Sequence, residues 1–535
     1  MGRPDKAALS RRDLVRWMAL GAGAGPLAAW LAGCATSDRP AAGPSTTGTA
    51  TSATNGPIRS TTTTAAPRTV APATTAASAT TAAVPTTAGV DPARPWWMQG
   101  NFAPITTEAE TVRLEVVGAL PPELNGLYVR NGSNPAVGDS PHWFFGDGML
   151  HGLRLTDGRA EWYANRYVGT TMYQAGAGFG QGPPGGAANQ SNVSAIWHGG
   201  RMLTSGEVGL PYEVRTDDLT TIGPYDFAGA LTTAFTAHPK IDPATGRMHF
   251  FGYGFVAPFL TYHIAEPDGS LVHSETVDLP RSTMIHDFAI TERDAVFWDL
   301  PVVFDLDAAI RFIDDPNAGA FPYRWAPEVG ARVGVMPLAG GAGAIQWFDI
   351  EPCYVFHGVN AFRRGDEVVV DVCRSTSMFA AGEVFGGEQS LRRWTLDTAS
   401  GMARDDVIET EDPGELPTRD PRLVGREYRH AYLVSGREHP DTIDFGGVIK
   451  HDYRTGSRQR WDPGPTAHGG EWLFVPTTAD TADDAGFLLC FVHDDATGTS
   501  ELVVIDATDV PAGPVARVPT PQRVPYGFHG TWVPT

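Results

Sequence analysis

Short, strand-length apolar runs separated by turn signals fill the chain from about residue 91 to its end. The runs are rich in Val, Phe, Tyr and Trp, residues that favour pleated strands. Five examples are 126–130, 247–253, 294–298, 367–372 and 486–492. No long stretch shows the 3.6-residue period of a core helix, and the best short helix candidates are residues 305–314 and 387–396. The pattern therefore predicts an all-β domain over residues 91–535.

Several all-β architectures fit a segment of this length. Its strands could form one large barrel, two sandwiches or a propeller. Many segments share a strand, an Asp-containing turn with Gly and a second strand, but no regular repeat signature recurs. A seven-bladed propeller would use about 64 residues per blade, against roughly 40 to 50 in ordinary repeats, so it implies insertions. The pattern alone favours a propeller only weakly.

The first 34 residues are predicted to be an export signal rather than part of the fold. Arg11 and Arg12 resemble a twin-arginine motif, and the apolar stretch 17–33 that follows is short for a membrane span. It ends in Leu-Ala-Gly-Cys, which resembles a lipobox and would make Cys34 a lipidated N-terminus. We expect an exported protein that is lipid-anchored to the outer face of the bacterial cytoplasmic membrane. An uncleaved anchor or a chance apolar run is the alternative.

Residues 35–90 have the composition of a disordered linker. They contain 17 Thr, 15 Ala, 6 Pro and 5 Ser among 56 residues, and no aromatic residue. Such a segment cannot bury enough apolar area to offset its ordering entropy. We therefore expect a tether between the signal and the folded domain.

Charge and cysteine content exclude two classes of protein. The formal net charge of −21 argues against a nucleic-acid partner. Four cysteines in 535 residues cannot form a disulfide scaffold. Cys353, Cys373 and Cys490 are expected to be buried strand thiols, with a Cys353–Cys373 pair left open.

Four of the 15 histidines stand out because each lies among small or apolar residues at the mouth of a predicted strand. They are His238, His286, His357 and His529. An unsatisfied imidazole is costly in such a place, and a shared metal would satisfy one nitrogen of each. Their separations of 48, 71 and 172 residues are too long for a local zinc motif. The inner strands of a propeller, however, converge on one axis. Four neutral imidazoles suit iron, copper or zinc, and four unrelated core histidines are the alternative.

Six motifs in a fixed order give the chain a family resemblance. They are residues 126–135, 142–151, 237–242, 285–291, 356–362 and 525–530. Over residues 95–535 the chain resembles the carotenoid cleavage oxygenases. That resemblance implies a seven-bladed β-propeller with a loop and helical cap over one face. It also implies a non-haem Fe(II) ion on the axis, held by the four histidines named above.

The resemblance further implies a second set of residues behind the metal ligands. Glu207, Glu415 and Glu471 match the family's carboxylates that accept hydrogen bonds from three of the ligand imidazoles. A ligand histidine binds metal through one nitrogen, and its other N–H needs an acceptor. A 2+ ion with three carboxylates is also nearly balanced in charge. For each glutamate, an ordinary solvated charge on a strand is the alternative.

Two positions depart from the family pattern, and a third differs from one branch of the family. Ser133 in the first motif and Phe145 in the second stand where many family members have other residues. Both could alter the cap or the tunnel. The stilbene-cleaving branch usually has a Lys directly before the first glutamate, where this chain has Gly206. A side chain that is absent cannot hold a phenol, so we favour a carotenoid or apocarotenoid substrate. Aromatic residues that could line an apolar tunnel are Trp143, Phe144, Trp298, Trp325 and Phe528, and the alternative for most of them is packing in the core.

The expected reaction is oxidative cleavage of one C=C bond by O₂, which gives two carbonyl products. The cofactor would be Fe(2+), and no protein nucleophile is required. A stilbene or phenylpropanoid dioxygenase with the same site is one alternative. A lipid-anchored propeller that binds an apolar ligand without catalysis is another.

Overall fold

The computed structural model describes residues 91, 94–138, 140–177, 186–314, 321–380, 385–437, 444–477 and 482–535. The expected signal peptide with Cys34, and the expected linker over residues 35–90, lie outside these ranges. Among the residues described, no helix is both long and apolar enough to cross a membrane.

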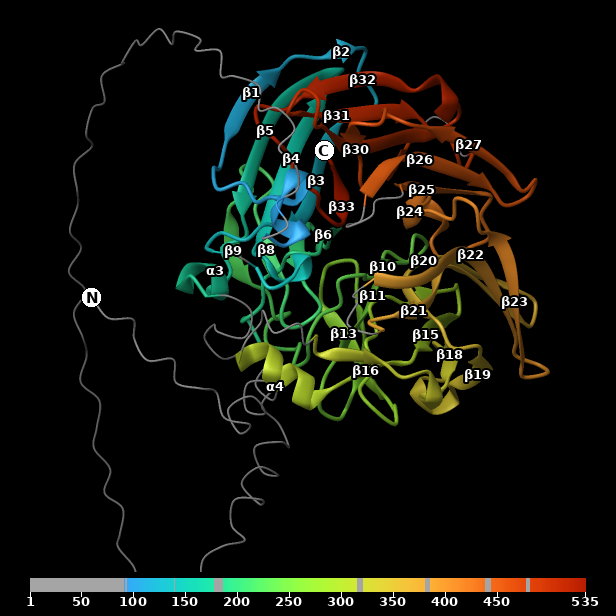
Figure 1. The fold of residues 1–535 in the computed structure, drawn as a ribbon. Coiled ribbons are helices and arrows are strands. Elements are labelled where there is room, and N and C mark those ends of the chain that lie inside the picture. The colour runs from blue at the N-terminus through green and yellow to red at the C-terminus, as the bar shows by residue number, and fades with distance from the viewer. Residues whose placement is uncertain are drawn as a thin grey trace, which may run out of the picture. The chain divides into compact units, whose positions relative to one another are not determined.

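Seven antiparallel sheets form the blades of a β-propeller (Figure 1). Five blades have four strands each. The first two are β6 (Ser194–His198), β7 (Arg201–Ser205), β8 (Tyr212–Val214), β9 (Thr221–Pro224); and β10 (Lys240–Ile241), β11 (Met248–Tyr253), β12 (Leu260–Ala265), β13 (Leu271–Val277). The next three are β14 (Ala289–Ile290), β15 (Asp294–Asp299), β18 (Ala331–Pro337), β19 (Gln346–Ile350); β20 (Tyr354–Arg364), β21 (Glu367–Met378), β22 (Phe385–Asp397), β23 (Met402–Glu409); and β24 (Glu415–Thr418), β25 (His430–Arg437), β26 (Asp444–Asp452), β27 (Ser457–Trp461).

The other two blades combine strands from both ends of the folded chain. One contains β2 (Val117–Gly118), β32 (Pro514–Pro519), β31 (Thr499–Asp506) and β30 (Gly486–Asp494), with β28 (Ala467–His468) and β29 (Leu473–Pro476) paired to β30. The other has the order β1 (Glu110–Leu114), β5 (Arg159–Tyr167), β4 (Gly148–Thr156), β3 (Gly126–Ser133) and β33 (Gly530–Pro534). In Figure 1 the red β33 lies beside the teal β3, with Tyr128 opposite Trp532. These pairings close the ring of blades.

The five strand-length runs of the sequence lie in β3, β11, β15, β21 and β30, so the all-β prediction is confirmed. Apolar cores fill the spaces between neighbouring sheets. The largest contains residues of β15, β18, β20 and β21, with Trp298 and Trp394 fully buried in it. Cys353, Cys373 and Cys490 are buried free thiols, as expected, and Cys353 does not pair with Cys373.

Helices are few in the part of the chain that the structure describes. They are α3 (Thr171–Ala175) and α4 (Leu306–Asp314), with short 3₁₀ turns η1 (Trp96–Met98), η2 (Gly100–Phe102), η3 (Trp143–Phe145), η4 (Pro327–Val329), η5 (Ala342–Ala344), η6 (Pro421–Leu423) and η7 (Val510–Ala512). The α4 helix follows the small hairpin strand β16 (Val302–Phe304) and precedes its partner β17 (Tyr323–Trp325). The α4 helix packs against η3, where the ring centroid of Phe312 lies 5.1 Å from that of Phe145. The helix predicted at 305–314 is therefore confirmed.

The helix predicted at 387–396 is wrong, because these residues belong to β22. Leu391 and Trp394 are buried and three residues apart, a spacing that also suits a helix face. In the fold, β22 pairs on both sides, with β21 and β23. Arg393 also forms an ion pair of 2.7 Å with the buried Asp371 of β21. Cross-strand pairing thus overrides the local pattern.

Candidate metal centre

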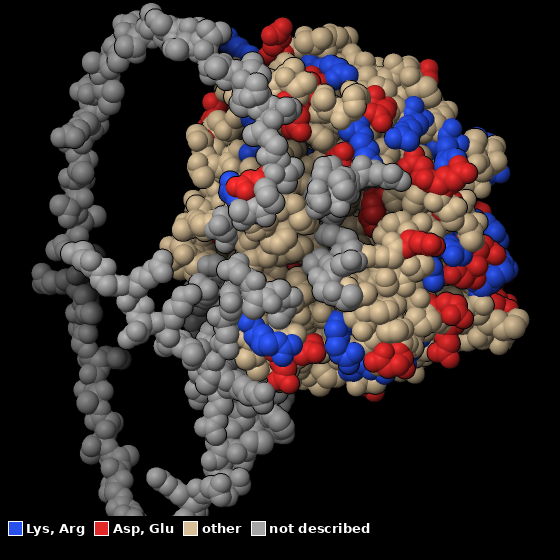
Figure 2. Space-filling view, viewed as in Figure 1, with Lys and Arg blue, Asp and Glu red and all other residues tan. Residues whose placement is uncertain are grey.

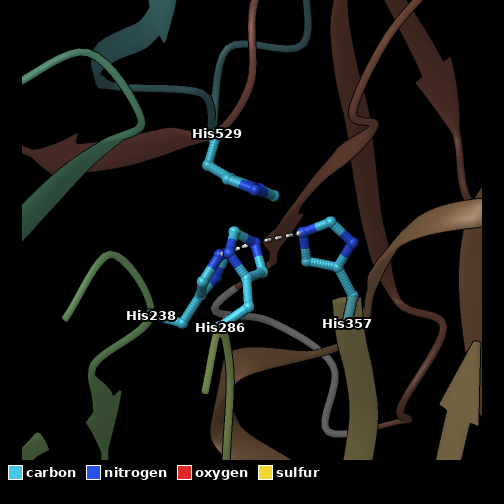
Figure 3. A group of neighbouring side chains, drawn as sticks. All are labelled: His238, His286, His357 and His529. Carbon is cyan, nitrogen blue, oxygen red and sulfur yellow. Dashed lines mark hydrogen bonds between the residues drawn. The ribbon is translucent and has the colours of Figure 1, made fainter. Parts of the chain in front are cut away.

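The four predicted histidines come together at the inner edges of four different blades. His238 lies two residues before β10, His286 three before β14, His357 within β20, and His529 directly before β33. Figure 3 shows the four imidazoles pointing toward one another. Nε2 of His286 lies 2.9 Å from Nε2 of His238 and 3.4 Å from Nε2 of His357. One ring nitrogen from each residue lies within 4.8 Å of those of the others.

These distances fit a shared ion. Two imidazole nitrogens that bind one metal at about 2.1 Å and at right angles lie about 3.0 Å apart. The separations of 2.9 and 3.4 Å given above bracket that value. Four nitrogen donors without a sulfur ligand suit iron, copper, nickel or zinc. The cluster therefore has the chemistry and the spacing of a metal site.

The backbone around His357 is shaped to place this side chain. Strand β20 shifts register between Val355 and Gly358, so His357 lies in a β-bulge, a feature that re-aims side chains near functional sites. A Cβ on Gly358 would lie 2.8 Å from the ring of the buried Trp298. Only glycine therefore permits this close approach beside the histidine.

Three glutamates stand behind three of the imidazoles. Nδ1 of His286 contacts Oε1 of Glu207. Nδ1 of His357 lies 2.6 Å from Oε2 of Glu415, and Nδ1 of His529 lies 2.8 Å from Oε1 of Glu471. These are the three glutamates singled out in the sequence, and each contact leaves Nε2 free for a metal. The carboxylates thereby fix the tautomer and orientation of the rings.

Each glutamate is itself held in place. Oε2 of Glu471 accepts a 2.7 Å hydrogen bond from the backbone N–H of Gly530, and Glu415 accepts one of 2.5 Å from the backbone N–H of Leu416. Leu416 adopts a left-handed backbone with φ of 47°, an unfavourable conformation for a leucine and one that recurs at functional sites. Glu207 differs, because Oε2 accepts a 2.5 Å hydrogen bond from the hydroxyl of Tyr253.

The protonation of the rings follows from burial and from these partners. Burial lowers the pKa of His238 well below its usual value, and the neighbouring imidazoles lower it further. Burial also lowers the pKa of His357, although the charge of Glu415 opposes the shift. Burial of His286 is outweighed by the charge and hydrogen bond of Glu207, so its pKa is raised. Neutral rings such as that of His238 offer a lone pair to a metal.

A cavity of about 510 Å³ opens onto the histidine cluster. Its wall includes His286, His357 and His529, and most of the remaining wall is aromatic or aliphatic. This volume and apolar character are typical of sites for small organic ligands. An ion held by these histidines would therefore face a space fit for an apolar molecule.

Three of the five aromatic residues expected in a tunnel line this cavity. They are Trp143, Phe144 and Phe528. Trp298 and Trp325 instead belong to the core between the blades, where Trp298 is 1% exposed and Trp325 packs at its edge. These two follow the core alternative, because bulky aromatic residues also fill inter-blade space.

The two departures from the family pattern have identifiable surroundings. Phe145 lines the cavity, and its ring lies 5.7 Å from that of Phe321. Ser133 is buried at the end of β3, where its Oγ accepts a 2.9 Å hydrogen bond from the N–H of Gly146. Phe145 thus packs against Phe312 of α4 and forms part of the cavity wall, while Ser133 fastens the turn that carries it.

Sequence reasoning missed three residues close to the cluster. They are Tyr253, Lys240 and Asp287. The hydroxyl of Tyr253 contacts Glu207, and Lys240 pairs with Asp287 at 2.6 Å. Lys240 and Asp287 lie within the histidine motifs themselves. A charged residue in such an apolar segment could have indicated a buried partner near the ligands. Tyr253 gave no such signal, because it ends an ordinary apolar strand.

Charged side chains on the outer surface are mixed in sign. On the face shown in Figure 2, the Lys and Arg side chains of the described residues are interspersed with Asp and Glu. Among those residues, this face offers no continuous basic surface of the kind that binds phosphate backbones.

Comparison with known proteins gives the centre a family context. A family model described as retinal pigment epithelial membrane protein matches residues 102–534. A carotenoid cleavage oxygenase of Mycobacterium tuberculosis is 36% identical, over 82% of this chain and 97% of the relative. A carotenoid 9,10(9′,10′)-cleavage dioxygenase of Arabidopsis thaliana is 34% identical, over 82% of this chain and 89% of the relative.

Solved structures match over the same region. Lignostilbene dioxygenase of Pseudomonas brassicacearum has a TM-score of 0.75 and 30% identity, over 82% of this chain and 99% of that one. A variant of Synechocystis apocarotenoid oxygenase has a TM-score of 0.72 and 27% identity, over 81% and 98%. The fold, the histidine cluster and these matches agree. The chain therefore belongs to the carotenoid cleavage oxygenase family and is an oxygenase enzyme.

Proposed function

We propose that the chain is a non-haem Fe(II) dioxygenase that cleaves one C=C bond of a carotenoid or apocarotenoid with O₂, giving aldehyde or ketone products. The observation that carries this proposal is the convergence of four imidazoles beside an apolar cavity of about 510 Å³. The metal ligands are His238, His286, His357 and His529. Bound ferrous iron would supply the binding and activation of O₂.

The protein's own residues orient the reactants. Glu207, Glu415 and Glu471 hold three imidazoles as fixed donors. Their three negative charges exceed the charge of a 2+ ion by one, so the centre is nearly balanced. The apolar wall binds a hydrocarbon chain and excludes water from the reacting bond. Which double bond reacts then depends on how deep the cavity lets the substrate enter.

Carotenoid relatives and the residue before Glu207 favour a polyene substrate. The sequence relatives at 36% and 34% identity are carotenoid-cleaving by name. Gly206 lines the cavity and offers no group that could hold a phenol. Stilbene cleavage is the second candidate, supported by the similarity to lignostilbene dioxygenase.

We also propose export through a twin-arginine signal and lipid anchoring at Cys34. The support is the motif order of residues 1–34. The test is cell fractionation of the wild-type chain and of Cys34→Ala. Release of the variant from membranes supports the anchor, and equal membrane content contradicts it.

The test of the activity is aerobic incubation of the iron-loaded full chain with carotenoids, apocarotenals and stilbenes. Chromatography identifies the carbonyl products, and ¹⁸O₂ shows whether oxygen enters them. We expect cleavage of a polyene and loss of both iron and turnover in His286→Ala. Turnover of stilbenes alone would favour the second candidate, and full activity in His286→Ala would overturn the site assignment.

A further inference from the structure

One buried carboxylate contacts groups from two other segments of the histidine cluster. The side chain of Asp287 is 2% exposed. Its Oδ1 lies 2.6 Å from Nζ of Lys240, whose side chain is 14% exposed. Its Oδ2 accepts a 2.9 Å hydrogen bond from the backbone N–H of Gly358. Asp287 also accepts a 2.7 Å hydrogen bond from the N–H of Phe288, which fixes its own rotamer.

The positions of these partners in the sequence connect the carboxylate to the ligands. Asp287 directly follows one histidine of the cluster, and Gly358 directly follows another. Lys240 lies two residues after a third. Strands β10, β14 and β20 belong to three different blades. The side chain of Asp287 therefore connects histidine segments of three blades. A shift of this carboxylate would move three imidazoles relative to one another.

His238 depends on this arrangement more than the other three histidines. Within the described part of the chain, no carboxylate contacts the ring of His238, whereas each of the others has a glutamate. Its backbone N–H donates to Oγ1 of Thr236, and its segment continues into Lys240. The ion pair of Lys240 with Asp287 therefore holds the segment that has no glutamate of its own.

The histidine before β33 shows the same device with a different acid. Glu471 accepts the backbone N–H of Gly530, the residue directly after His529. Asp287 accepts the backbone N–H of Gly358, the residue directly after His357. In both places a buried carboxylate fixes the backbone just after a ligand. Metal affinity depends on such outer partners as well as on the ligands.

We propose that Asp287 is a positioning residue that sets the spacing of three imidazoles through Lys240 and Gly358. The inference rests on the proposed metal site and deepens it. Asp287 does not touch the ion; it determines the geometry in which the ion is held. Lys240 is the cation that pairs with this buried carboxylate.

The test compares three variants of the full chain with the wild type. Asp287→Asn removes the charge but keeps the shape. Asp287→Asn with Lys240→Met also removes the cation that would otherwise be buried without a partner, a defect that destabilises by itself. Asp294→Asn is the matched control, because Asp294 of β15 is a buried carboxylate that pairs with Arg363 of β20 at 2.6 Å and is not a member of the histidine cluster.

The probe is Co²⁺, whose visible absorption reports coordination geometry without turnover. We expect Asp287→Asn and the double variant to bind Co²⁺ roughly 10–100-fold more weakly in chelator competition, with altered absorption bands. The double variant should recover thermal stability but not affinity or spectrum. Asp294→Asn should lose stability and keep the wild-type spectrum.

Two results would overturn the inference in different ways. A double variant with wild-type affinity and spectrum would make Asp287 an ordinary buried ion-pair partner, with the metal site intact. A wild-type chain that binds neither Co²⁺ nor Fe²⁺ would overturn the proposed metal site, and the positioning role with it.

Discussion

Replacing Glu471 by Gln tests whether the carboxylates behind the imidazoles stabilise both the fold and the metal site. Glu471 is 7% exposed and accepts two hydrogen bonds, one of 2.8 Å from His529 and one of 2.7 Å from the N–H of Gly530. An amide can accept only one of them and turns its NH₂ toward the other donor. His529 and Gly530 lead into β33, the strand that closes the ring of blades.

The expected magnitude follows from those two contacts. A hydrogen bond to a charged group contributes about 1.5–3 kcal/mol, and a buried donor left unpaired costs about 1–3 kcal/mol. Glu471→Gln should therefore lower the free energy of unfolding of the metal-free chain by about 2–4 kcal/mol. It should also weaken metal binding by roughly 10–100-fold.

Urea unfolding measures the first effect and chelator competition the second. Glu501→Gln is the control, because Glu501 of β31 is 27% exposed and, among the described residues, forms its ion pair with Arg517. The control should change stability by about 1 kcal/mol or less and leave metal affinity unchanged. If the two variants behave alike in both assays, the reasoning about Glu471 is refuted.

Three further predictions concern Tyr253, Gly206 and His468. Tyr253→Phe removes the hydroxyl that fixes Glu207, so Co²⁺ absorption should shift while the fold is retained; an unchanged spectrum contradicts this role. At Gly206 a Cβ would have its nearest neighbour at 3.6 Å, so the backbone has room for the Cβ of a side chain. Gly206→Lys should raise the ratio of stilbene to polyene cleavage in product chromatography. An unchanged ratio contradicts it. Burial of His468 is outweighed by hydrogen bonds to two aspartates, which raise its pKa to about 9 from 6.5. The stabilisation of the fold by protonated His468 is complete below pH 6.5 and is lost as the pH rises through 9. Between pH 6.5 and 9.5 the wild type should therefore lose about 1–2 kcal/mol more stability in urea than His468→Gln, after allowance for screening. Equal losses contradict it.

Strand content could be predicted from sequence because it depends on local composition. Runs such as 367–372 have too many β-branched residues, and too many turns around them, to be helical. Register and blade membership could not be predicted, because they depend on pairing between distant strands. Residues 387–396 show the difference. The spacing of Leu391 and Trp394 suits a helix face, but in the fold this segment is a strand that pairs with β21 on one side and β23 on the other. The five-residue α3 was too short to leave a periodic signal.

The site was more accessible than the architecture. A histidine in apolar surroundings has ring nitrogens that require a hydrogen-bond or metal partner, so His286 and His357 could be identified from the sequence. Their convergence was one of two interpretations of the residues, and the family resemblance favoured it over four unrelated core histidines. The partners that complete the site were less visible. Tyr253 reaches Glu207 across 46 residues, and Lys240 reaches Asp287 between blades, contacts that only tertiary structure creates.

The most direct test of the central claim is X-ray absorption at the iron edge of the full chain, reconstituted anaerobically with Fe²⁺. Multiple scattering from imidazole rings counts the histidine ligands. The account predicts one iron per chain surrounded by four imidazoles, those of His238, His286, His357 and His529. Iron bound with fewer imidazoles, or a first shell made of oxygen alone, would contradict it.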